Sequence, residues 1–526
     1  MNKPVIDNLT QLLGKEGLSE VDADRALFSE DIWAKGELAD FVISPETTQQ
    51  LSDAVALAHR AGVSLNPRGG GMSYTKGYTP DRAGTAMLDL SRMNRIVEVN
   101  AADMTVTVQA GVTWAELHAA LAPKGLRTPF WGPLSGLSST IGGGLSQNNA
   151  FFGAGTHGPS TDSVTSLTVV LADGTIVKTG TAASPKGKPF WRQYGPDLTG
   201  LFLSDAGAFG YKAEATLRLI PLPTNEDHAS FEFADAERWA EAMAEMGRLG
   251  FACELFGFDP NLQVVRMKRA SLAADFKTLG NVVTKAKGGL MKGLKDGAKV
   301  VLSGRNFIDQ AAYSLHWIVE GYSAGEVAAK MDRLKQIAAD RGGKEIENSI
   351  PKIMRTNPFG PLNSVLGPHG ERWVPIHGIV SMGDGPACVA AMDKMFAGMK
   401  PELDAHEITT GYLLTTLSTN GYLVEPVFIW PEEIHPIHER TVDVATLKRA
   451  KRFEANPAAT ALVTQARQNV MDIFTEFGAA HFQIGRTYPY LDNMSDEAKQ
   501  LLQGIKALLD PDGRVNPGSL GLNPCT

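Results

Sequence analysis

The sequence has little of what marks an exported, metal-binding or membrane-spanning protein. Its 526 residues include three cysteines, Cys253, Cys388 and Cys525, which lie far apart and form no C-x-x-C pair. Neither a disulfide framework nor a cysteine zinc site is therefore expected, and such cysteine usage is typical of a reducing compartment. The first twenty residues contain neither a long apolar segment nor a run that could span a bilayer, so we expect a cytoplasmic protein.

Positive charge is also scarce. Lys and Arg number 50 and Asp and Glu 58, which gives a net charge of −8. An acidic chain is on average repelled by a phosphate polymer, so no nucleic-acid partner is expected. The chain is nevertheless long, and 43% of its residues are hydrophobic. Because one hydrophobic core does not normally extend over so many residues, at least two domains are predicted.

Both common nucleotide-binding motifs are absent. The chain has no G-x-x-x-x-G-K-[ST] and no G-x-G-x-x-G that opens a long helix with an acidic residue further on, which argues against a P-loop or Rossmann protein. Two other glycine-rich segments are present: residues 66–78 contain three consecutive glycines, and residues 133–149 contain Ser and Thr followed by three more. Turns of this kind can aim several backbone N–H groups at one anion, so we predict that they hold a diphosphate. The first segment alone would be interpreted as an ordinary surface turn.

Hydrophobic periodicity and turn residues predict the order of helices and strands. In the first part of the chain we expect a helix at 5–20, strand–helix–strand over 39–65 with a cap at 44–46, short strands over 85–110, a helix at 114–121, a hairpin over 165–179 and a domain boundary at 218–223. Beyond it, helices are predicted at 234–249, 325–340, 386–398, 458–477 and 497–509, and strands at 251–258, 373–382 and over most of 412–430. This alternation of helices and strands predicts a second domain.

Five segments in the same order along the chain, together with the two glycine-rich segments, carry a family resemblance: residues 43–68, 93–117, 169–179, 194–223 and 506–520. They resemble the flavin-binding domain of the vanillyl-alcohol oxidase and p-cresol methylhydroxylase (PCMH) family, which also contains D-lactate and glycolate dehydrogenases. The resemblance implies an α+β, two-domain flavoprotein, in which residues 1–224 and 481–526 form a PCMH-type FAD-binding domain and residues 225–480 an inserted α/β cap domain. It also implies a homodimer, as in many relatives.

The resemblance assigns cofactor contacts to both glycine-rich segments and to positions elsewhere. The predicted FAD-binding residues are Pro67, Arg68, Gly69, Gly70, Gly71, Met72 and Ser73 in the first segment, Pro133, Ser135, Ser138, Ser139, Thr140, Gly142, Gly143, Asn148 and Asn149 in the second, and His157, Gly158, Gly207, Gly210, His377 and Asn516 elsewhere. In relatives a strand histidine forms a covalent bond to the flavin, and His377 in WVPIHGIVS matches its register. We expect His377 to be linked to the flavin or adjacent to it, the alternative being a hydrogen-bonded core histidine.

Three residues lie at or next to positions that hold an anionic substrate in phenol-oxidising relatives. Arg486 shortly precedes Tyr488, and Tyr74 lies in the first glycine-rich segment. A guanidinium is permanently charged and can bind a phenolate or a carboxylate. We therefore predict that Arg486, Tyr74 and Tyr488 form an anion-binding triad, with a surface salt bridge of Arg486 as the alternative.

The aspartate that serves as base in vanillyl-alcohol oxidase is replaced here by Leu134. Either another group takes the proton or the substrate does not require a base. The candidates are Glu425, Tyr422 and His438. Glu425 is an acid among apolar strand residues, and such an acid is expected to be paired or to have a raised pKa. A structural salt bridge is the alternative role for Glu425. His435 and His438 lie three residues apart without an obvious third ligand, so no metal site is predicted.

The implied reaction is removal of a hydride from a C–H bond next to an oxygen or an aromatic ring, onto flavin N5. A para-substituted phenol or aryl alcohol, and hence aromatic-compound metabolism, is the preferred prediction. A D-2-hydroxy acid such as lactate or glycolate is the alternative. The electrons would pass to O2 or to an electron carrier such as a cytochrome.

One stretch does not fit a compact cap domain. Residues 266–305 carry Lys and Arg interleaved with apolar side chains, against the acidic balance of the whole chain. Such a stretch predicts contact with an anionic membrane surface at the inner membrane face or with an acidic partner, or else a solvated excursion. The corresponding alternative function is a flavin-binding docking protein with little turnover.

Overall fold

The structure is a computed structural model, and it describes residues 3–271 and 312–522. The chain falls into two compact units. Unit 1 comprises Met1–Ala150, Pro159–Leu222 and Phe482–Thr526, and unit 2 comprises Phe151–Gly158 and Pro223–His481. The short piece Phe151–Gly158 thus belongs to unit 2, whereas sequence analysis placed it in the first part of the FAD-binding domain.

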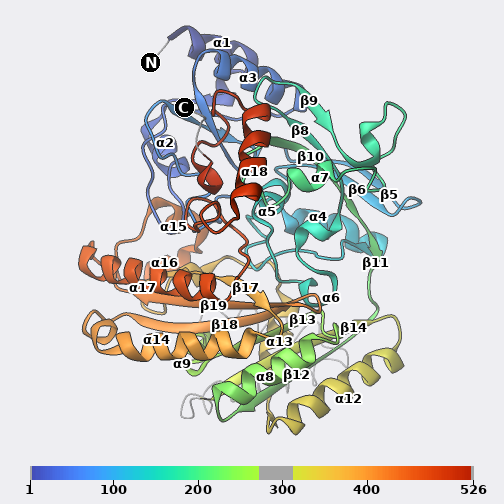
Figure 1. Ribbon diagram of the computed structural model, residues 1–526, viewed down its shortest axis with the longest axis vertical. Helices are drawn as coiled ribbons and strands as arrows, with labels where there is room; N and C mark the ends of the chain where they lie inside the picture. Colours follow the sequence, from blue (N-terminus) through green and yellow to red (C-terminus); the bar gives the residue numbers. More distant parts are fainter. Residues whose placement is uncertain (1–2, 272–311, 523–526) are drawn as a thin grey trace. The chain divides into compact units, whose positions relative to one another are not determined.

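Unit 1 contains short strands and helices in alternation (Figure 1). Its helices are α1 Lys3–Leu13, α2 Asp22–Phe28, α3 Thr48–Arg60, α4 Trp114–Leu121, α5 Ile141–Gln147, α7 Leu198–Leu201 and α18 Asp496–Leu509, with short 3-10 helices η1 Lys15–Gly17, η2 Ala122–Lys124, η3 Ser160–Ser163, η4 Gly180–Ala183 and η6 Ser519–Gly521. Its strands are β1 Leu18–Ser19, β2 Val42–Ile43, β3 Ser64–Arg68, β4 Thr85–Asp89, β5 Ile96–Asn100, β6 Thr105–Gln109, β7 Leu126–Arg127, β8 Val164–Val170, β9 Ile176–Lys178, β10 Tyr211–Arg218 and β11 Ile220–Pro221.

The strands of unit 1 form two main sheets. The first has the order β1-β2-β4-β3, in which β4 pairs in parallel with both β2 and β3. The second is antiparallel with the order β5-β6-β10-β8-β9, and β7 and β11 form a separate pair. Parallel pairing requires a crossover, and α3 supplies it between β2 and β3.

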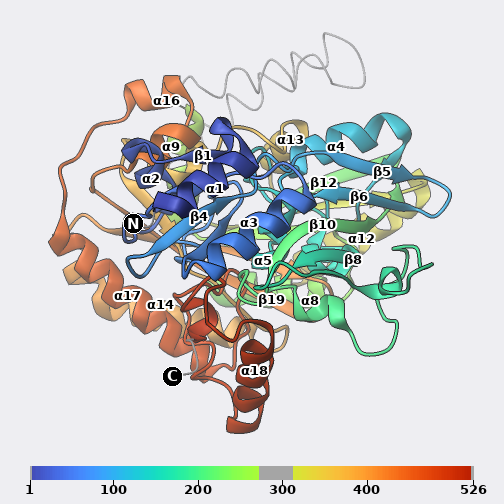
Figure 2. The ribbon, with the colours of Figure 1, turned by 90° about the horizontal axis from the view of Figure 1, so that it is seen from above.

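The core of unit 1 lies where α1 and α3 pack together, as Figure 2 also shows. Val5 and Leu9 of α1 are buried in one cluster with Leu51, Val55 and Ala58 of α3. These residues recur at helical spacing, so each helix buries one stripe. The Thr47 side chain accepts a hydrogen bond from the Gln50 backbone N–H and thereby fixes the start of α3.

Unit 2 consists of one large sheet and longer helices. Its helices are α6 Ala154–His157, α8 Ala236–Gly247, α9 Pro260–Ser271, α12 Ala324–Asp340, α13 Ser349–Thr356, α14 Gly385–Ala405, α15 Pro436–Thr441, α16 Val444–Arg449 and α17 Pro457–Glu476, with η5 Asn363–Val365. Its strands are β12 Asn225–Phe233, β13 Glu254–Phe258, β14 Tyr313–Gly321, β15 Lys344–Glu345, β16 Arg372–Pro375, β17 Gly378–Ser381, β18 Thr409–Leu417 and β19 Gly421–Trp430. They pair in the order β15-β12-β14-β13-β18-β19-β16, and β17 also pairs with β19.

One face of this sheet is covered by helices. The Tyr422 hydroxyl on β19 lies 3.5 Å from the Ala240 carbonyl oxygen of α8, and the Trp317 indole N–H on β14 points at the Met331 sulfur of α12, 3.1 Å away. Figure 1 shows α8, α12 and α14 along the same side of the sheet. We call this the helix-covered face; neighbouring residues on each strand point to the opposite face.

Most predicted elements are confirmed, including the α+β class, the hairpin over 165–179 and the long helices of the second half. Some boundaries were wrong. The first helix ends at Leu13, because Gly14 adopts φ +77° and the chain turns into η1 and β1. The α3 cap is Thr47 rather than 44–46. The strand expected over 373–382 is divided into β16 and β17, with His377 between them.

Candidate functional site

The two glycine-rich segments of unit 1 touch each other backbone to backbone. A Cβ atom at Gly70 would lie 1.8 Å from the Ser138 carbonyl oxygen, and one at Gly69 would lie 2.2 Å from Thr140 Oγ1. Real Cβ atoms essentially never approach closer than 3.0 Å, so only glycine permits this approach. The structure therefore brings together two segments that sequence analysis had assigned to one ligand.

The second segment is helical where a turn was expected. Helix α5 runs from Ile141 to Gln147, so Gly142 and Gly143 are helical residues, and the Thr140 side chain accepts a hydrogen bond from the Gly143 N–H at 3.3 Å. Glycine is a poor helix former, and the Thr cap offsets part of that cost. Gly142 is required for packing, because its Cβ would lie 2.6 Å from that of Ala110.

Buried polar atoms without a protein partner lie beside this helix. Both side-chain atoms of the Asn149 amide, Gln147 Oε1 and Trp114 Nε1 are buried and make no hydrogen bond. A Cβ at Gly144 would lie 2.7 Å from Asn149 Nδ2 and 2.8 Å from Trp114 Nε1, so these groups converge on one point of α5. An unsatisfied buried polar group costs about 1–3 kcal/mol. A polar ligand with several acceptors and donors would satisfy them.

Neither Trp114 nor Gln147 was among the predicted site residues. The position of Trp114 follows from the direction in which α4 points its side chains, which the sequence pattern does not reveal. Asn148 was predicted, but its Oδ1 already accepts a hydrogen bond from Thr161 Oγ1 at 2.8 Å.

Other residues of the predicted cofactor set shape the two glycine-rich segments and their surroundings. The Arg68 guanidinium is buried, lies 4.4 Å from the Phe28 ring centroid and would contact a Cβ at Gly71. Ser73 accepts a backbone hydrogen bond from the Ile32 N–H, and Gly207 packs against Pro67. In the second segment the Ser135 carbonyl accepts the N–H groups of Ser138 and Ser139, and the Pro133 carbonyl accepts that of Gly136; further on, Gly210 packs against Val169.

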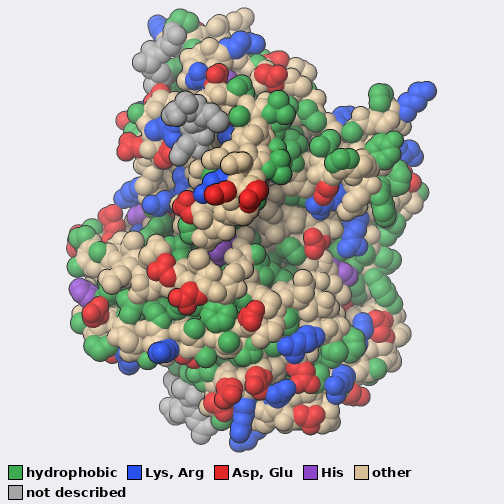
Figure 3. Space-filling model, in the orientation of Figure 1, with side chains coloured by type: hydrophobic (Ala, Val, Ile, Leu, Met, Phe, Trp, Pro, Cys, Tyr) green, Lys and Arg blue, Asp and Glu red, His purple; other side chains and the backbone are tan. Residues whose placement is uncertain are grey.

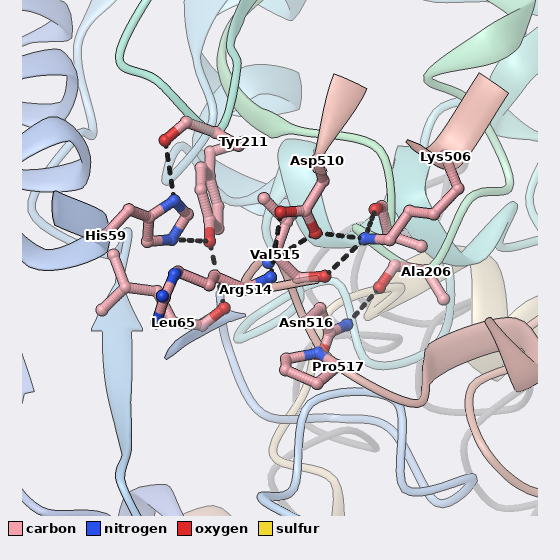
Figure 4. A network of polar contacts seen from close by, with 12 residues as sticks. His59, Leu65, Ala206, Tyr211, Lys506, Asp510, Arg514, Val515, Asn516 and Pro517 are labelled. Carbon is pink, nitrogen blue, oxygen red and sulfur yellow. Dashed lines mark hydrogen bonds and ion pairs between the residues drawn. The ribbon is translucent and has the colours of Figure 1, made fainter. Parts of the chain in front are cut away.

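The C-terminal segment of unit 1 is tied to the first glycine-rich segment by Asn516, as Figure 4 shows in part. Its Nδ2 donates to the carbonyl oxygens of Gly77 at 2.9 Å and Ala206 at 2.6 Å, and its Oδ1 accepts from Arg486 at 2.8 Å. Nearby, the buried Lys506 ammonium pairs with Asp510 at 2.6 Å. The network links segments more than 400 residues apart and fixes the backbone behind the glycines.

Arg486 does not have the environment expected of a substrate-binding arginine. Its guanidinium donates to the carbonyl oxygens of Lys76 and Pro517 and to Asn516 Oδ1, which occupies four of its five N–H groups. Burial lowers the pKa of Arg486 to about 10. Its contacts are those of a cross-link between loop 75–77 and residues 516–517. Of the other predicted triad members, Tyr74 and Tyr488 are buried, and the Tyr74 hydroxyl accepts from Gln483 Nε2 at 3.0 Å.

His377 belongs to unit 2 and is fully buried between β16 and β17. Burial, and then the neighbouring His481, hold the pKa of His377 well below its ordinary value. The His377 carbonyl accepts a hydrogen bond from His481 Nδ1 at 2.9 Å. The imidazole is therefore neutral at pH 7, as a bond to a flavin ring would require; the attachment itself stays a prediction.

Two of the predicted base candidates lie on opposite faces of the large sheet. Glu425 pairs in register with Leu413, which pairs with Phe258, and these residues share one face. Tyr422 lies on the helix-covered face, where burial holds the pKa of its hydroxyl well above the ordinary value. Glu425 and Tyr422 therefore cannot act on one substrate atom. Glu425 lies on the face that α8, α12 and α14 do not cover.

The face that carries Glu425 also carries the piece Phe151–Gly158. The Phe151 ring contacts that of Phe256, with centroids 5.8 Å apart, and Phe256 shares this face with Glu425. The same piece contains His157 and Gly158, which were predicted to contact the cofactor. Within unit 2, then, a predicted base and two predicted cofactor residues lie on the same side of the sheet.

The geometry of His438 does not suit a base. Its Nδ1 accepts the backbone N–H of His435 at 3.0 Å. Burial, followed by the nearby Arg372, lowers the pKa of His438 to about 3. The neutral ring must therefore carry its proton on Nε2, and this nitrogen cannot take another proton at pH 7.

Within residues 3–271 and 312–522, no group of three or more His, Cys, Asp or Glu side chains is arranged to hold a metal ion. No helix in the same part of the chain is long and apolar enough to cross a membrane. Most of the basic stretch 266–305 lies outside the described residues.

The two glycine-rich segments approach each other as closely as only glycine permits, and unsatisfied polar groups lie beside them. This arrangement fits a dinucleotide with a diphosphate and defines unit 1 as a nucleotide-cofactor-binding domain. Residues 39–180, which include both segments, match the family model described as an FAD binding domain. All of this stretch except Phe151–Gly158 lies in unit 1, and the match supports FAD as the cofactor.

Curated relatives include the glycolate oxidase subunit GlcD of Bacillus subtilis, 34% identical over 42% of this chain and 46% of the relative. The mitochondrial D-lactate dehydrogenase [cytochrome] 1 of Saccharomyces cerevisiae is 30% identical over 46% of this chain and 42% of the relative. The match thus spans less than half the length of either relative.

Two solved structures share the fold over nearly the whole chain. p-Cresol methylhydroxylase with substrate bound has a TM-score of 0.73 at 14% identity, covering 99% of this chain and 97% of the other. The isoeugenol complex of 4-ethylphenol oxidase from Gulosibacter chungangensis has a TM-score of 0.71 at 16% identity, with the same coverage. At this identity the likeness concerns the fold alone.

Proposed function

We propose that the chain is an FAD-dependent oxidoreductase that removes a hydride from a small substrate onto flavin N5. The observation that carries the proposal is the close approach of Gly70 to the Ser138 backbone and of Gly69 to the Thr140 side chain, inside the stretch that matches an FAD-binding domain. When bound, FAD supplies the two-electron acceptor. The diphosphate would be held by backbone N–H groups of the first segment, and the unpaired amide of Asn149 in the second segment would add a side-chain contact.

A D-2-hydroxy acid is the substrate class that we favour. The carboxylate base of phenol oxidation is replaced by Leu134, and the Arg486 guanidinium is largely used within the protein. The names of the two curated relatives, glycolate oxidase subunit and D-lactate dehydrogenase, support the same class. In the proposed reaction the Glu425 carboxylate would take the proton of the substrate hydroxyl, and bound FAD would supply the acceptor for the hydride from the carbon that bears this hydroxyl, so that a 2-oxo acid is left.

A para-substituted phenol, which was the preferred prediction from the sequence, is here the second candidate. It is supported by the buried Tyr74 and Tyr488, because a tyrosine hydroxyl that accepts a hydrogen bond, as Tyr74 does from Gln483, becomes a better donor to a phenolate. The fold shared with p-cresol methylhydroxylase is compatible with it.

The acceptor and the assembly belong to the same proposal. We propose that the electrons pass to O2 or to an electron carrier, and the name of the yeast relative supports a cytochrome. A cytoplasmic homodimer, covalent attachment through His377 and a docking protein with little turnover stay as proposals from sequence analysis. Flavin fluorescence that remains with the denatured chain, and is lost in His377→Ala, would support the attachment.

Anaerobic reduction of the purified holoprotein tests the proposal. Its flavin absorbance should bleach on adding D-lactate or glycolate and recover with air or an artificial acceptor. L-Lactate is the matched control for stereochemistry. Bleaching by 4-ethylphenol and not by either hydroxy acid would transfer the proposal to the phenol class, and a panel in which nothing bleaches would favour the docking protein.

A further inference from the structure

An aromatic loop projects from unit 1 after strand β9. Residues 184–198, which we call the aromatic loop, contain Phe190, Trp191 and Tyr194, whose side chains are 52%, 58% and 67% exposed. In the described part of the chain four aromatic side chains are exposed to this degree, and the fourth is Tyr322. Three of the four thus lie within five residues, although aromatic side chains are normally the first to be buried.

The backbone of the loop is held although its rings are exposed. The Pro189 carbonyl accepts from Thr165 Oγ1 at 2.7 Å, and the Trp191 carbonyl accepts from the Thr181 N–H at 2.9 Å. The Arg192 guanidinium donates to the Thr161 carbonyl at 3.0 Å and pairs with Asp197. These hydrogen bonds fix the base of the loop to β8 and η4, so the aromatic side chains are presented outward by a preorganised segment.

Exposed lysines lie in the aromatic loop and just before it in the sequence. Lys178, Lys186 and Lys188 are all exposed, whereas the loop's one acidic residue, Asp197, is paired with Arg192. Lys188 also meets Asp103 at 3.4 Å, an exposed pair of little strength. Figure 3 shows basic and apolar side chains together at the upper right, over the loop that follows β9 in Figure 1. The combination contrasts with the net charge of −8 of the chain.

We propose that the aromatic loop docks on the headgroup region of an anionic lipid bilayer. Trp and Tyr prefer the membrane–water interface, where a ring enters the apolar side and its polar group stays wet, and nearby Lys side chains are attracted to anionic headgroups. A protein partner is less suited to this surface, because stable protein interfaces use about 20–30 residues a side. A fluid bilayer requires no matching shape and can receive a single projecting loop.

Co-sedimentation of the full-length holoprotein with vesicles tests the proposal. We expect binding to phosphatidylcholine vesicles that contain phosphatidylglycerol, and about tenfold weaker binding to phosphatidylcholine alone. The triple variant Phe190→Ser, Trp191→Ser, Tyr194→Ser should bind the vesicles at least about tenfold more weakly. Burial of about half of one such ring in the bilayer already accounts for a tenfold change in affinity. Its flavin spectrum and melting temperature should not change, because the rings make few contacts within the protein.

Tyr322→Ser is the matched control, since it removes an equally exposed aromatic side chain elsewhere and should leave vesicle binding unchanged. The proposal is overturned if the wild-type protein does not bind the anionic vesicles, or if the triple variant binds them as well as the wild type. It is equally overturned if the wild-type protein self-associates through the loop, so that the triple variant becomes monomeric while neither form binds lipid.

Discussion

Replacing Gly70 by alanine adds one methyl group at the closest contact between the two glycine-rich segments. Its Cβ would lie 1.8 Å from the Ser138 carbonyl oxygen, where 3.0 Å is the shortest separation that real Cβ atoms show. The two backbones must therefore separate by at least about 1.2 Å. Overpacking of this kind costs about 1–3 kcal/mol, and a displacement near 1 Å in a binding site can lower its function about a hundredfold.

We expect Gly70→Ala to be purified with little flavin and to bind added FAD about 10–100-fold more weakly, because the groups that hold the cofactor are moved apart. Titration of apoprotein with FAD, followed by flavin fluorescence, measures this. Gly504→Ala in α18 is the matched control: nothing lies within 4 Å of its added Cβ, and alanine should stabilise that helix by about 0.8–1 kcal/mol. Wild-type FAD affinity in Gly70→Ala would refute the reasoning.

Three further predictions concern single side chains. Glu425→Gln should lower the rate of anaerobic flavin reduction by hydroxy acids about 10²–10⁴-fold with unchanged FAD content, as loss of a base would, and an unchanged rate would exclude that role. Arg486→Lys should lower the free energy of unfolding by about 2–4 kcal/mol with little change in KM, since it breaks hydrogen bonds within the protein; a raised KM at unchanged stability would instead indicate an anion-binding role. Burial lowers the pKa of His59 to about 4, below its unfolded value of about 6.5, so stability should be lost as pH falls through this window. By linkage this loss amounts to about 3 kcal/mol, and His59→Gln should flatten denaturation midpoints measured between pH 7 and 4.

Local features of the fold could be predicted from the sequence because they depend on local residues. The spacing of Val5 and Leu9 marks the buried stripe of α1, and the Ala-Asp-Gly turn at 172–174 marks the β8–β9 hairpin. The end of α1 was missed although Gly14 was visible and Leu18 is the one large apolar residue in the predicted remainder, 15–20. The glycine runs indicated a site for a phosphate-bearing ligand without a common motif.

The contacts of the site could not be predicted, because they join residues far apart in the chain. Nothing in the sequence places the Ser138 carbonyl oxygen against Gly70, or Lys76 and Pro517 around the Arg486 guanidinium. The proton position on His438 likewise depends on one backbone N–H. Tyr422 and Glu425 are different: they are three residues apart on one strand, so their opposite orientation was already implied by the period of two.

Hydrogen exchange of the apoprotein, compared with and without added FAD, tests the central claim most directly. We predict that FAD protects peptides that cover residues 66–78 and 133–149 more strongly than any other part of unit 1, because backbone N–H groups of the first segment and the Asn149 amide of the second would face the cofactor. Protection that falls elsewhere, with these two segments unchanged, would contradict the account.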